Sequence, residues 1–135
     1  MKAKTTLGGA MLMLASLAAT AAQPADFLAR FEREARQADG AFAASPARGE
    51  AWFQARHGRE WSCSTCHTPD PAGRGKHAVT GKPIEPMAPV ANPERLTSDR
   101  SVDKWFRRNC RDVVGRECTP AEKADVIAYL MRVGS

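Results

Sequence analysis

The chain has 135 residues, of which 43% are hydrophobic, 26% charged and 7% aromatic, and its formal net charge is +5. This length accommodates one small domain and excludes a two-domain enzyme. The charge is mild and no basic stripe interleaved with aromatic residues is present, so the composition suits an acidic protein partner and gives no argument for nucleic acid.

The N-terminus has the pattern of a secretory signal peptide, residues 1–22. A basic head and an apolar stretch from Leu7 to Ala19 precede small residues, and we expect cleavage after Ala21 or Ala22. A transmembrane anchor is the alternative, but the apolar stretch is shorter than the roughly 20 residues that span a bilayer. The sequence therefore predicts an exported, periplasmic bacterial protein of residues 23–135, with no membrane insertion after cleavage.

Two helices are expected next. Residues 25–38 carry apolar side chains at a spacing of four, which predicts an amphipathic helix. Ser45 and Pro46 then have the residue types of an N-cap and a first helical position, so a second helix begins there and ends by Gly58.

Regular structure is expected to vanish over residues 61–93. This stretch contains six prolines and three glycines, which is typical of loop and not of helix or strand. A loop this long is abnormal in a compact domain unless it packs on something. A bound cofactor would supply that packing surface.

The C-terminal third is predicted to hold two more helices. The first begins at Asp99 or Ser101 and places Trp105 and Asn109 on one face. The second begins at Thr119, which opens a capping box with proline at the first helical position. No strand with sustained alternation is visible, so the predicted fold class is all-α.

The motif Cys63-Ser64-Thr65-Cys66-His67 has the spacing of c-type haem attachment. Its two thiols can add to both vinyl groups of one haem, and the adjacent histidine is then placed as the proximal iron ligand. A zinc site would need a second ligand pair at short spacing, and a thioredoxin-like pair would follow a strand. The motif therefore predicts one covalently bound haem c.

Beyond the motif, the chain resembles the class I cytochromes c. Gly49 and Phe53 resemble residues of their first helix, and Val126 and Tyr129 resemble residues of their last. The resemblance implies a small class I cytochrome c fold, with helices and long loops wrapped around the haem. It also implies that Gly49 and Phe53 meet Val126 and Tyr129 where those helices cross. The helix at residues 25–38 would be an extra N-terminal element.

The sixth iron ligand is the open question that the motif leaves. Electron-transfer cytochromes c usually use a methionine sulfur. After the signal peptide only Met87 and Met131 remain, the first in the proline-rich stretch and the second on the last helix. In class I cytochromes the ligand comes from the segment before the last helix, here residues 105–118, which contains no methionine or histidine. It does contain Asn109, a residue type also common at helix ends with no haem role.

Residues 105–110 and 115–125 resemble the sphaeroides haem protein (SHP) family, in which an asparagine replaces the methionine ligand. The resemblance implies that Asn109 is the distal ligand, that Cys110 and Cys118 form a disulfide, and that the asparagine leaves on reduction. The ferrous iron would then bind oxygen or nitric oxide. Electrons would come from another cytochrome, with a multihaem cytochrome c and a membrane cytochrome b as the implied partners.

Ligand chemistry agrees with that expectation, because an amide oxygen is a hard, weak donor that suits ferric better than ferrous iron. Two alternatives stay open. One is an ordinary electron carrier without gas binding, ligated by Met87 or permanently by Asn109. The other is an enzyme acting on the gas, although we find no general acid or base placed for it and do not expect enzymatic activity.

Several further polar groups are candidates for contacts with the haem. Arg74, Lys76, Arg95 and Trp105 are candidates to bind its propionates. The class I resemblance also suggests the carbonyl of Pro83 as the hydrogen-bond acceptor of the proximal histidine.

Overall fold

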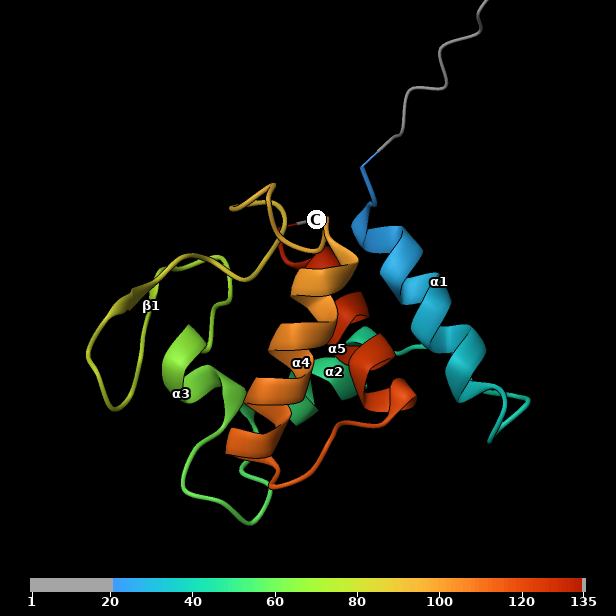
Figure 1. The fold of residues 1–135 in the computed structure, drawn as a ribbon, viewed down its shortest axis with the longest axis horizontal. Helices are drawn as coiled ribbons and strands as arrows, with labels where there is room; N and C mark the ends of the chain where they lie inside the picture. Colours follow the sequence, from blue (N-terminus) through green and yellow to red (C-terminus); the bar gives the residue numbers. More distant parts are fainter. Residues whose placement is uncertain (1–20, 135) are drawn as a thin grey trace, which may run out of the picture.

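The computed structural model describes residues 21–134, so the prediction of a signal peptide depends on residues that lie almost wholly outside the described range. Within that range the chain forms five helices and two short strands (Figure 1). No described helix is long and apolar enough to cross a membrane. The elements are α1 (Pro24–Ala35), α2 (Pro46–Gln54), α3 (Cys63–His67), β1 (Gly75–Lys76), β2 (Pro83–Ile84), α4 (Asp99–Val113) and α5 (Pro120–Arg132).

The predicted helix starts are confirmed by their capping hydrogen bonds. The Ser45 side chain accepts from the backbone N–H of Arg48, and the Thr119 side chain accepts from that of Glu122. Both helices have proline at their first position, where the missing N–H leaves no bond unmade. The helix ends are less accurate, because α1 stops at Ala35 and α2 at Gln54, earlier than the sequence predicts.

Helix α5 lies at the centre of the molecule, and α1 and α2 pack on it. Gly49 of α2 is the closest approach: a Cβ at this position would lie 2.0 Å from the carbonyl oxygen of Asp125. Beside it the rings of Phe53 and Tyr129 lie 5.6 Å apart, and Val126 joins the same buried cluster. The predicted crossing of the first and last cytochrome helices is therefore confirmed.

The core consists of two buried clusters on either side of α5. The cluster nearer α1 comprises Phe27, Phe31, Val102, Ala124 and Ile127. The cluster nearer the haem-attachment motif comprises Phe53, Val126, Tyr129 and Leu130. Val102 of α4 belongs to the first cluster and Phe106 of α4 packs against both, so these two side chains anchor α4 to the core.

Ion pairs also fasten α4 to α1. The guanidinium of Arg30 lies 3.0 Å from Asp99 and 2.6 Å from Asp103. It also lies over the rings of Phe27 and Phe31, at 5.4 and 4.4 Å from their centroids. The extra N-terminal helix is thus part of the core of this domain.

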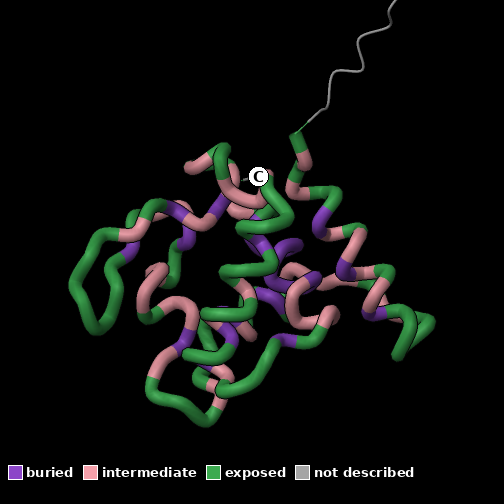
Figure 2. The backbone as a smooth tube through the Cα atoms, in the orientation of Figure 1, coloured by how far each residue is buried: buried purple, intermediate pink, exposed green. Residues whose placement is uncertain are grey.

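Residues 61–93 contain more regular structure than predicted. Residues Cys63–His67 form the short helix α3, and β1 and β2 pair antiparallel with Gly75 opposite Ile84. These elements are too short to produce a recognisable period, which is why proline and glycine content indicated only loop. Figure 2 shows that the hairpin between the strands is exposed, whereas buried residues gather on the central helices.

Candidate functional site

The haem-attachment motif is held by a capping box at the start of α3. The backbone N–H of Ser62 donates to the Thr65 side chain at 3.0 Å, and the Ser62 side chain accepts from the Thr65 backbone at 3.2 Å. Ser62 is buried, so both bonds are shielded from water. The cap orients five residues as one helical turn that carries Cys63, Cys66 and His67. Ser62 was not singled out in the sequence, although serine before a short helix is the cap signal.

The turn ends sharply after the histidine. Thr68 has a φ of 62°, a left-handed conformation that is strained for a β-branched residue. Its hydroxyl donates to the carbonyl of Asp70, which supports the turn. Gly75 of β1 then passes so close that a Cβ would lie 2.1 Å from the Cys66 carbonyl oxygen. The hairpin therefore packs directly on the motif.

His67 is a half-buried imidazole whose Nδ1 has no hydrogen-bond partner among the residues that the structure describes. Its ring centroid lies 6.4 Å from that of Phe53. Burial, assisted by the positive charge of Arg95, lowers the pKa of His67 to about 4. The neutral imidazole, which is the metal-ligating form, is therefore present at neutral pH. The predicted hydrogen bond to the Pro83 carbonyl is not formed.

The two motif cysteines are free thiols of intermediate exposure. Burial raises the pKa of Cys63 to about 12, so this sulfur is a thiol rather than the thiolate of a reactive redox pair. No group of three or more histidine, cysteine, aspartate or glutamate side chains that could hold a metal ion gathers within residues 21–134. Two thiols beside a neutral, unsatisfied imidazole are the donor set that covalent haem attachment uses, so the residues fit haem c.

Asn109 lies in the last turns of α4 and is half-buried. Its side chain makes no hydrogen bond to any other part of the described chain. Phe106, one turn earlier, packs into the core, but Trp105 is 44% exposed beside the cations of Lys104 and Arg108. Of the two aromatic residues that precede Asn109 on α4, only Phe106 is packed into the core.

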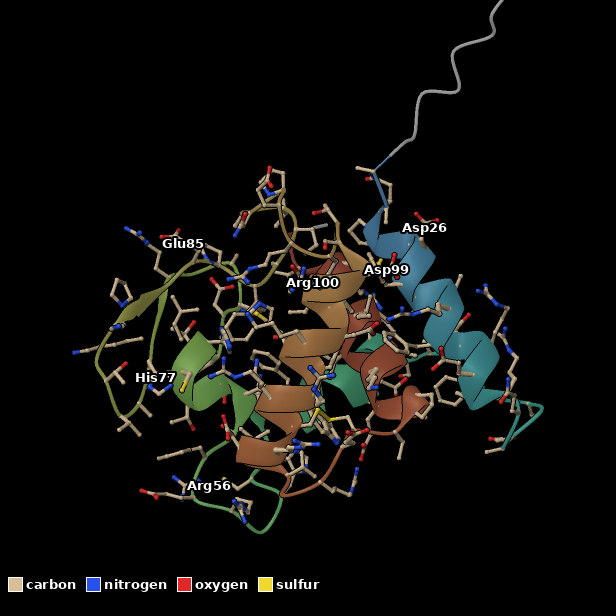
Figure 3. All side chains as sticks on the ribbon, in the orientation of Figure 1. Asp26, Arg56, His77, Glu85, Asp99 and Arg100 are labelled. Carbon is tan, nitrogen blue, oxygen red and sulfur yellow. A yellow bond between two sulfur atoms is a disulfide. The ribbon has the colours of Figure 1, made fainter. Side chains whose placement is uncertain are left out.

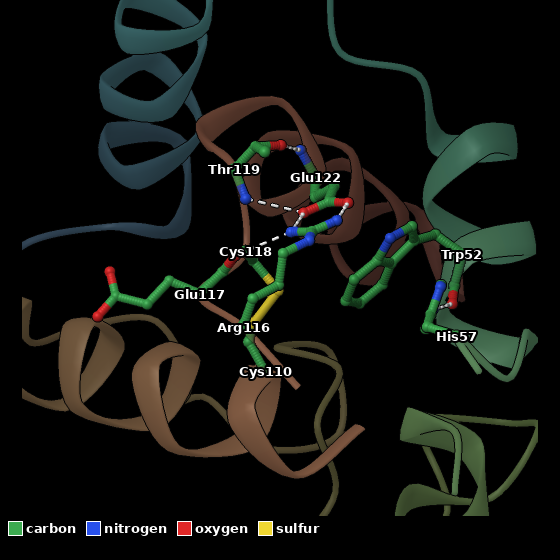
Figure 4. Close-up of a disulfide and its surroundings, with 8 residues drawn as sticks. All are labelled: Trp52, His57, Cys110, Arg116, Glu117, Cys118, Thr119 and Glu122. Atoms are coloured by element: carbon green, nitrogen blue, oxygen red, sulfur yellow. Dashed lines mark hydrogen bonds and ion pairs between the residues drawn. A yellow bond between two sulfur atoms is a disulfide. The ribbon is translucent and has the colours of Figure 1, made fainter. Parts of the chain in front are cut away.

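The predicted disulfide is confirmed between Cys110, next to Asn109, and Cys118, with a Cα–Cα distance of 5.6 Å. Figure 4 shows that the loop it closes is also tied to α5 by Arg116, which lies 2.7 Å from Glu122. Burial alone would raise the pKa of Glu122, but hydrogen bonds from Arg116 and from the Thr119 backbone lower it to about 2.

Beside this loop, the imidazole of His57 stacks on the Trp52 indole with centroids 4.4 Å apart. His57 is therefore half-buried.

Met87, the rival ligand, is half-buried and packs against the cluster of Phe53 and Leu130, which Cys63 also contacts. Its backbone N–H donates to the carbonyl of Pro71 at 2.8 Å. Pro71 is fully buried and also accepts a bond from the residue after Met87. This anchor was not foreseen in the sequence, because a backbone acceptor leaves no residue signature.

Comparison with known proteins places these features in context. Residues 39–130 match the family described as "Domain of unknown function (DUF1924)". Cytochrome c'' of Methylophilus methylotrophus is 46% identical over 79 residues, which are 58% of this chain and 55% of that protein. The cytochrome c-type protein SHP of Cereibacter sphaeroides is 52% identical over 69 residues, 51% and 53% of the two chains. The chain thus spans about half the length of the curated relatives it matches.

Solved structures extend the similarity over most of the chain. Oxidised cytochrome c'' from Methylophilus methylotrophus matches with a TM-score of 0.74 and 35% identity, covering 83% of this chain and 95% of that one. Oxidised SHP, described as an oxygen-binding cytochrome c, matches with a TM-score of 0.73 and 43% identity, covering 82% and 97%. The predicted small all-α cytochrome fold is confirmed.

Proposed function

Because the chain belongs to the DUF1924 family and, with its haem c, to the cytochrome family of SHP and cytochrome c'', we propose that it is a redox-gated gas-binding cytochrome. Cys63 and Cys66 hold the haem covalently, and His67 is the proximal ligand. Asn109 is the distal ligand of the oxidised protein and leaves on reduction. The haem iron supplies the redox change and, once ferrous, takes up a diatomic gas, either oxygen or nitric oxide.

The observation that carries this proposal is the unengaged amide of Asn109. Its side chain is half-buried and unbonded within the described chain, so its carbonyl oxygen is free to serve as a ligand. Metal ligands that bind firmly are usually oriented by further hydrogen bonds. A weak amide donor without such support is suited to release when the iron becomes softer on reduction. The disulfide at Cys110 keeps the helix end in place while the side chain leaves.

The alternative is an ordinary electron-transfer cytochrome that uses Met87 and binds no gas. Its support is the packing of Met87 on the same cluster as Cys63. Against it, the Met87 backbone is bonded to Pro71, four residues after His67 in the chain. This bond ties the Met87 backbone to the segment that directly follows His67, whereas Asn109 comes from α4, a separate element.

Optical spectra of Asn109→Ala and Met87→Ala, recorded in both oxidation states, distinguish these functions. We expect Asn109→Ala to make the ferric haem high-spin while covalent haem is retained. Met87→Ala is the matched control and should keep the wild-type spectra. The reduced wild-type protein should be five-coordinate and take up carbon monoxide at once. A high-spin ferric haem in Met87→Ala alone would replace the gas-binding proposal by electron transfer.

The cellular setting completes the proposal. Residues 23–135 form the mature single cytochrome domain, exported to the periplasm after loss of residues 1–22. There it receives electrons from another cytochrome, a multihaem cytochrome c or a membrane cytochrome b. Mass spectrometry of the protein purified from the periplasm tests the first part: a chain that begins at Ala22 or Gln23 is expected, and retention of Met1 would contradict it.

A further inference from the structure

Arg95 is a guanidinium fixed in place by backbone acceptors. Its Nε donates to the carbonyl of Pro86 at 2.8 Å, and its Nη2 donates to the carbonyl of Glu85 at 2.9 Å. Met87, the residue after Pro86, donates its backbone N–H to the carbonyl of Pro71. Arg95 is thereby held against residues 85–86, directly after β2.

This cation has no carboxylate of its own. No carboxylate in the described range forms an ion pair with Arg95, and the nearest in sequence, Glu85, is paired instead with Arg74. Figure 3 shows Glu85 at the outer edge of the hairpin region. Arg95 nevertheless has intermediate exposure, and burial lowers its pKa. The negative charge of Glu85 opposes this shift, but Glu85 forms its ion pair with Arg74, so Arg95 has no carboxylate bonded to it. A partly buried charge without a bonded counter-charge is costly unless a ligand supplies one.

The position of Arg95 relative to the motif indicates which ligand that is. The carbonyls that hold Arg95 directly follow Ile84, which pairs with Gly75, and Gly75 lies against the carbonyl of Cys66 in the motif. The other candidates for the same role are less suited: Arg74 is already paired with Glu85, and Lys76 is exposed on the hairpin. Trp105 carries no charge and lies beside the cations of α4.

We propose that Arg95 binds a haem propionate and is the carboxylate-binding residue of the cofactor site. The proposal rests on the attachment of haem through Cys63, Cys66 and His67. A guanidinium presents several N–H donors in a planar fork, so Arg95 can keep its two backbone bonds and still donate to a carboxylate. The propionate gains a fixed counter-charge and stays ionised, and the Arg95 charge favours the reduced iron.

The test is the reduction potential of holoprotein carrying Arg95→Gln, measured by spectroelectrochemistry between pH 5 and pH 8. Removal of the cation should lower the potential at pH 8. The deficit should shrink toward pH 5, because the unpaired propionate then takes up a proton from solvent and its charge is neutralised. Arg74→Gln is the matched control, an exposed arginine paired with Glu85, and should leave the potential unchanged. A wild-type potential in Arg95→Gln at every pH would overturn the proposal.

A second measurement avoids any variant. In wild-type protein whose haem carries ¹³C at both propionate carboxyl carbons, ¹³C NMR follows each carboxyl as the pH is lowered. One carboxyl should remain ionised at the pH at which the other takes up its proton. Two carboxyls that titrate like free carboxylic acids would overturn the proposal. Failure of haem attachment is recognised separately, because haem would then be extractable by acid-acetone. Failure of Asn109 ligation changes the ferric spin state and not the titration of the propionates.

Discussion

At the residue scale, the crossing of α2 and α5 depends on the absence of one side chain. The Gly49→Ala Cβ would lie 2.0 Å from the Asp125 carbonyl oxygen, and backbone cannot move aside as a flexible side chain can. We expect the free energy of unfolding to fall by about 2–3 kcal/mol. Gly40→Ala is the control, because a Cβ there meets nothing within 4 Å. Urea denaturation of both variants measures this, and equal stabilities would show that the crossing tolerates a methyl group.

Single residues also mark how far sequence reasoning reaches. Gly49 was identified through the resemblance of Gly49 and Phe53 to the first helix of class I cytochromes c, and the structure confirms its contact with α5. The isolated Nδ1 of His67 and the backbone anchor at Pro71 were not foreseen. Each feature depends on which backbone carbonyl lies within hydrogen-bond reach of the imidazole or of the Met87 N–H. The tertiary fold decides this, and no residue type in the sequence indicates it.

At the element scale, the carboxylate of Glu122 at the N-terminus of α5 stabilises the fold to an extent that depends on pH. The pKa of Glu122 is lowered to about 2 in the folded protein, against 4.5 for the unperturbed group. Its stabilisation is therefore complete above about pH 4.5 and is lost as the pH falls toward 2. Glu122→Gln should lower the free energy of unfolding by about 1–2 kcal/mol at pH 7, and the difference should vanish near pH 2.

The control for this prediction is Glu117→Gln in the neighbouring loop. Glu117 lies 3.4 Å from Arg111 and both side chains are exposed, so its loss should cost less than about 0.5 kcal/mol at any pH. Denaturant titrations at pH 7, 4 and 2.5 separate the two variants. A pH-independent deficit in Glu122→Gln would mean that packing, and not the ionised carboxylate, carries the effect.

The disulfide joins α4 to the segment that leads into α5. Cys110→Ser together with Cys118→Ser should lower the free energy of unfolding by about 2–3 kcal/mol. The two cysteines are only eight residues apart in sequence, so the disulfide removes a modest amount of chain entropy from the unfolded state. Guanidinium denaturation checks the magnitude. Counting thiols in unfolded, unreduced wild-type protein checks the bond itself, and two reactive thiols there would contradict it.

At the scale of the whole molecule, sequence reasoning succeeded for long elements and failed for short ones. The four helices of nine or more residues were predicted because capping residues mark their starts or because apolar residues recur at helical spacing along them. Residues 61–93 were predicted as loop, yet they hold α3 and the β1–β2 hairpin. Their shape is determined by contacts such as Gly75 on Cys66 and not by local propensity. The haem-attachment motif was nevertheless identified, because its chemistry depends on spacing and not on the fold.

Because the core consists of two clusters, we expect the protein without attached haem to lose structure unevenly along the chain. The cluster of Phe27, Phe31 and Ile127 contains no residue of the haem-attachment motif, whereas the cluster around Phe53 contacts Cys63 directly. In protein carrying Cys63→Ala and Cys66→Ala, the haem that we expect residues 61–98 to cover would not be attached. Hydrogen exchange followed by mass spectrometry should show that this segment loses protection first and most, with α1 and α5 retaining more. Uniform loss of protection along the chain would instead mean that the two clusters unfold as one cooperative unit that depends on the haem.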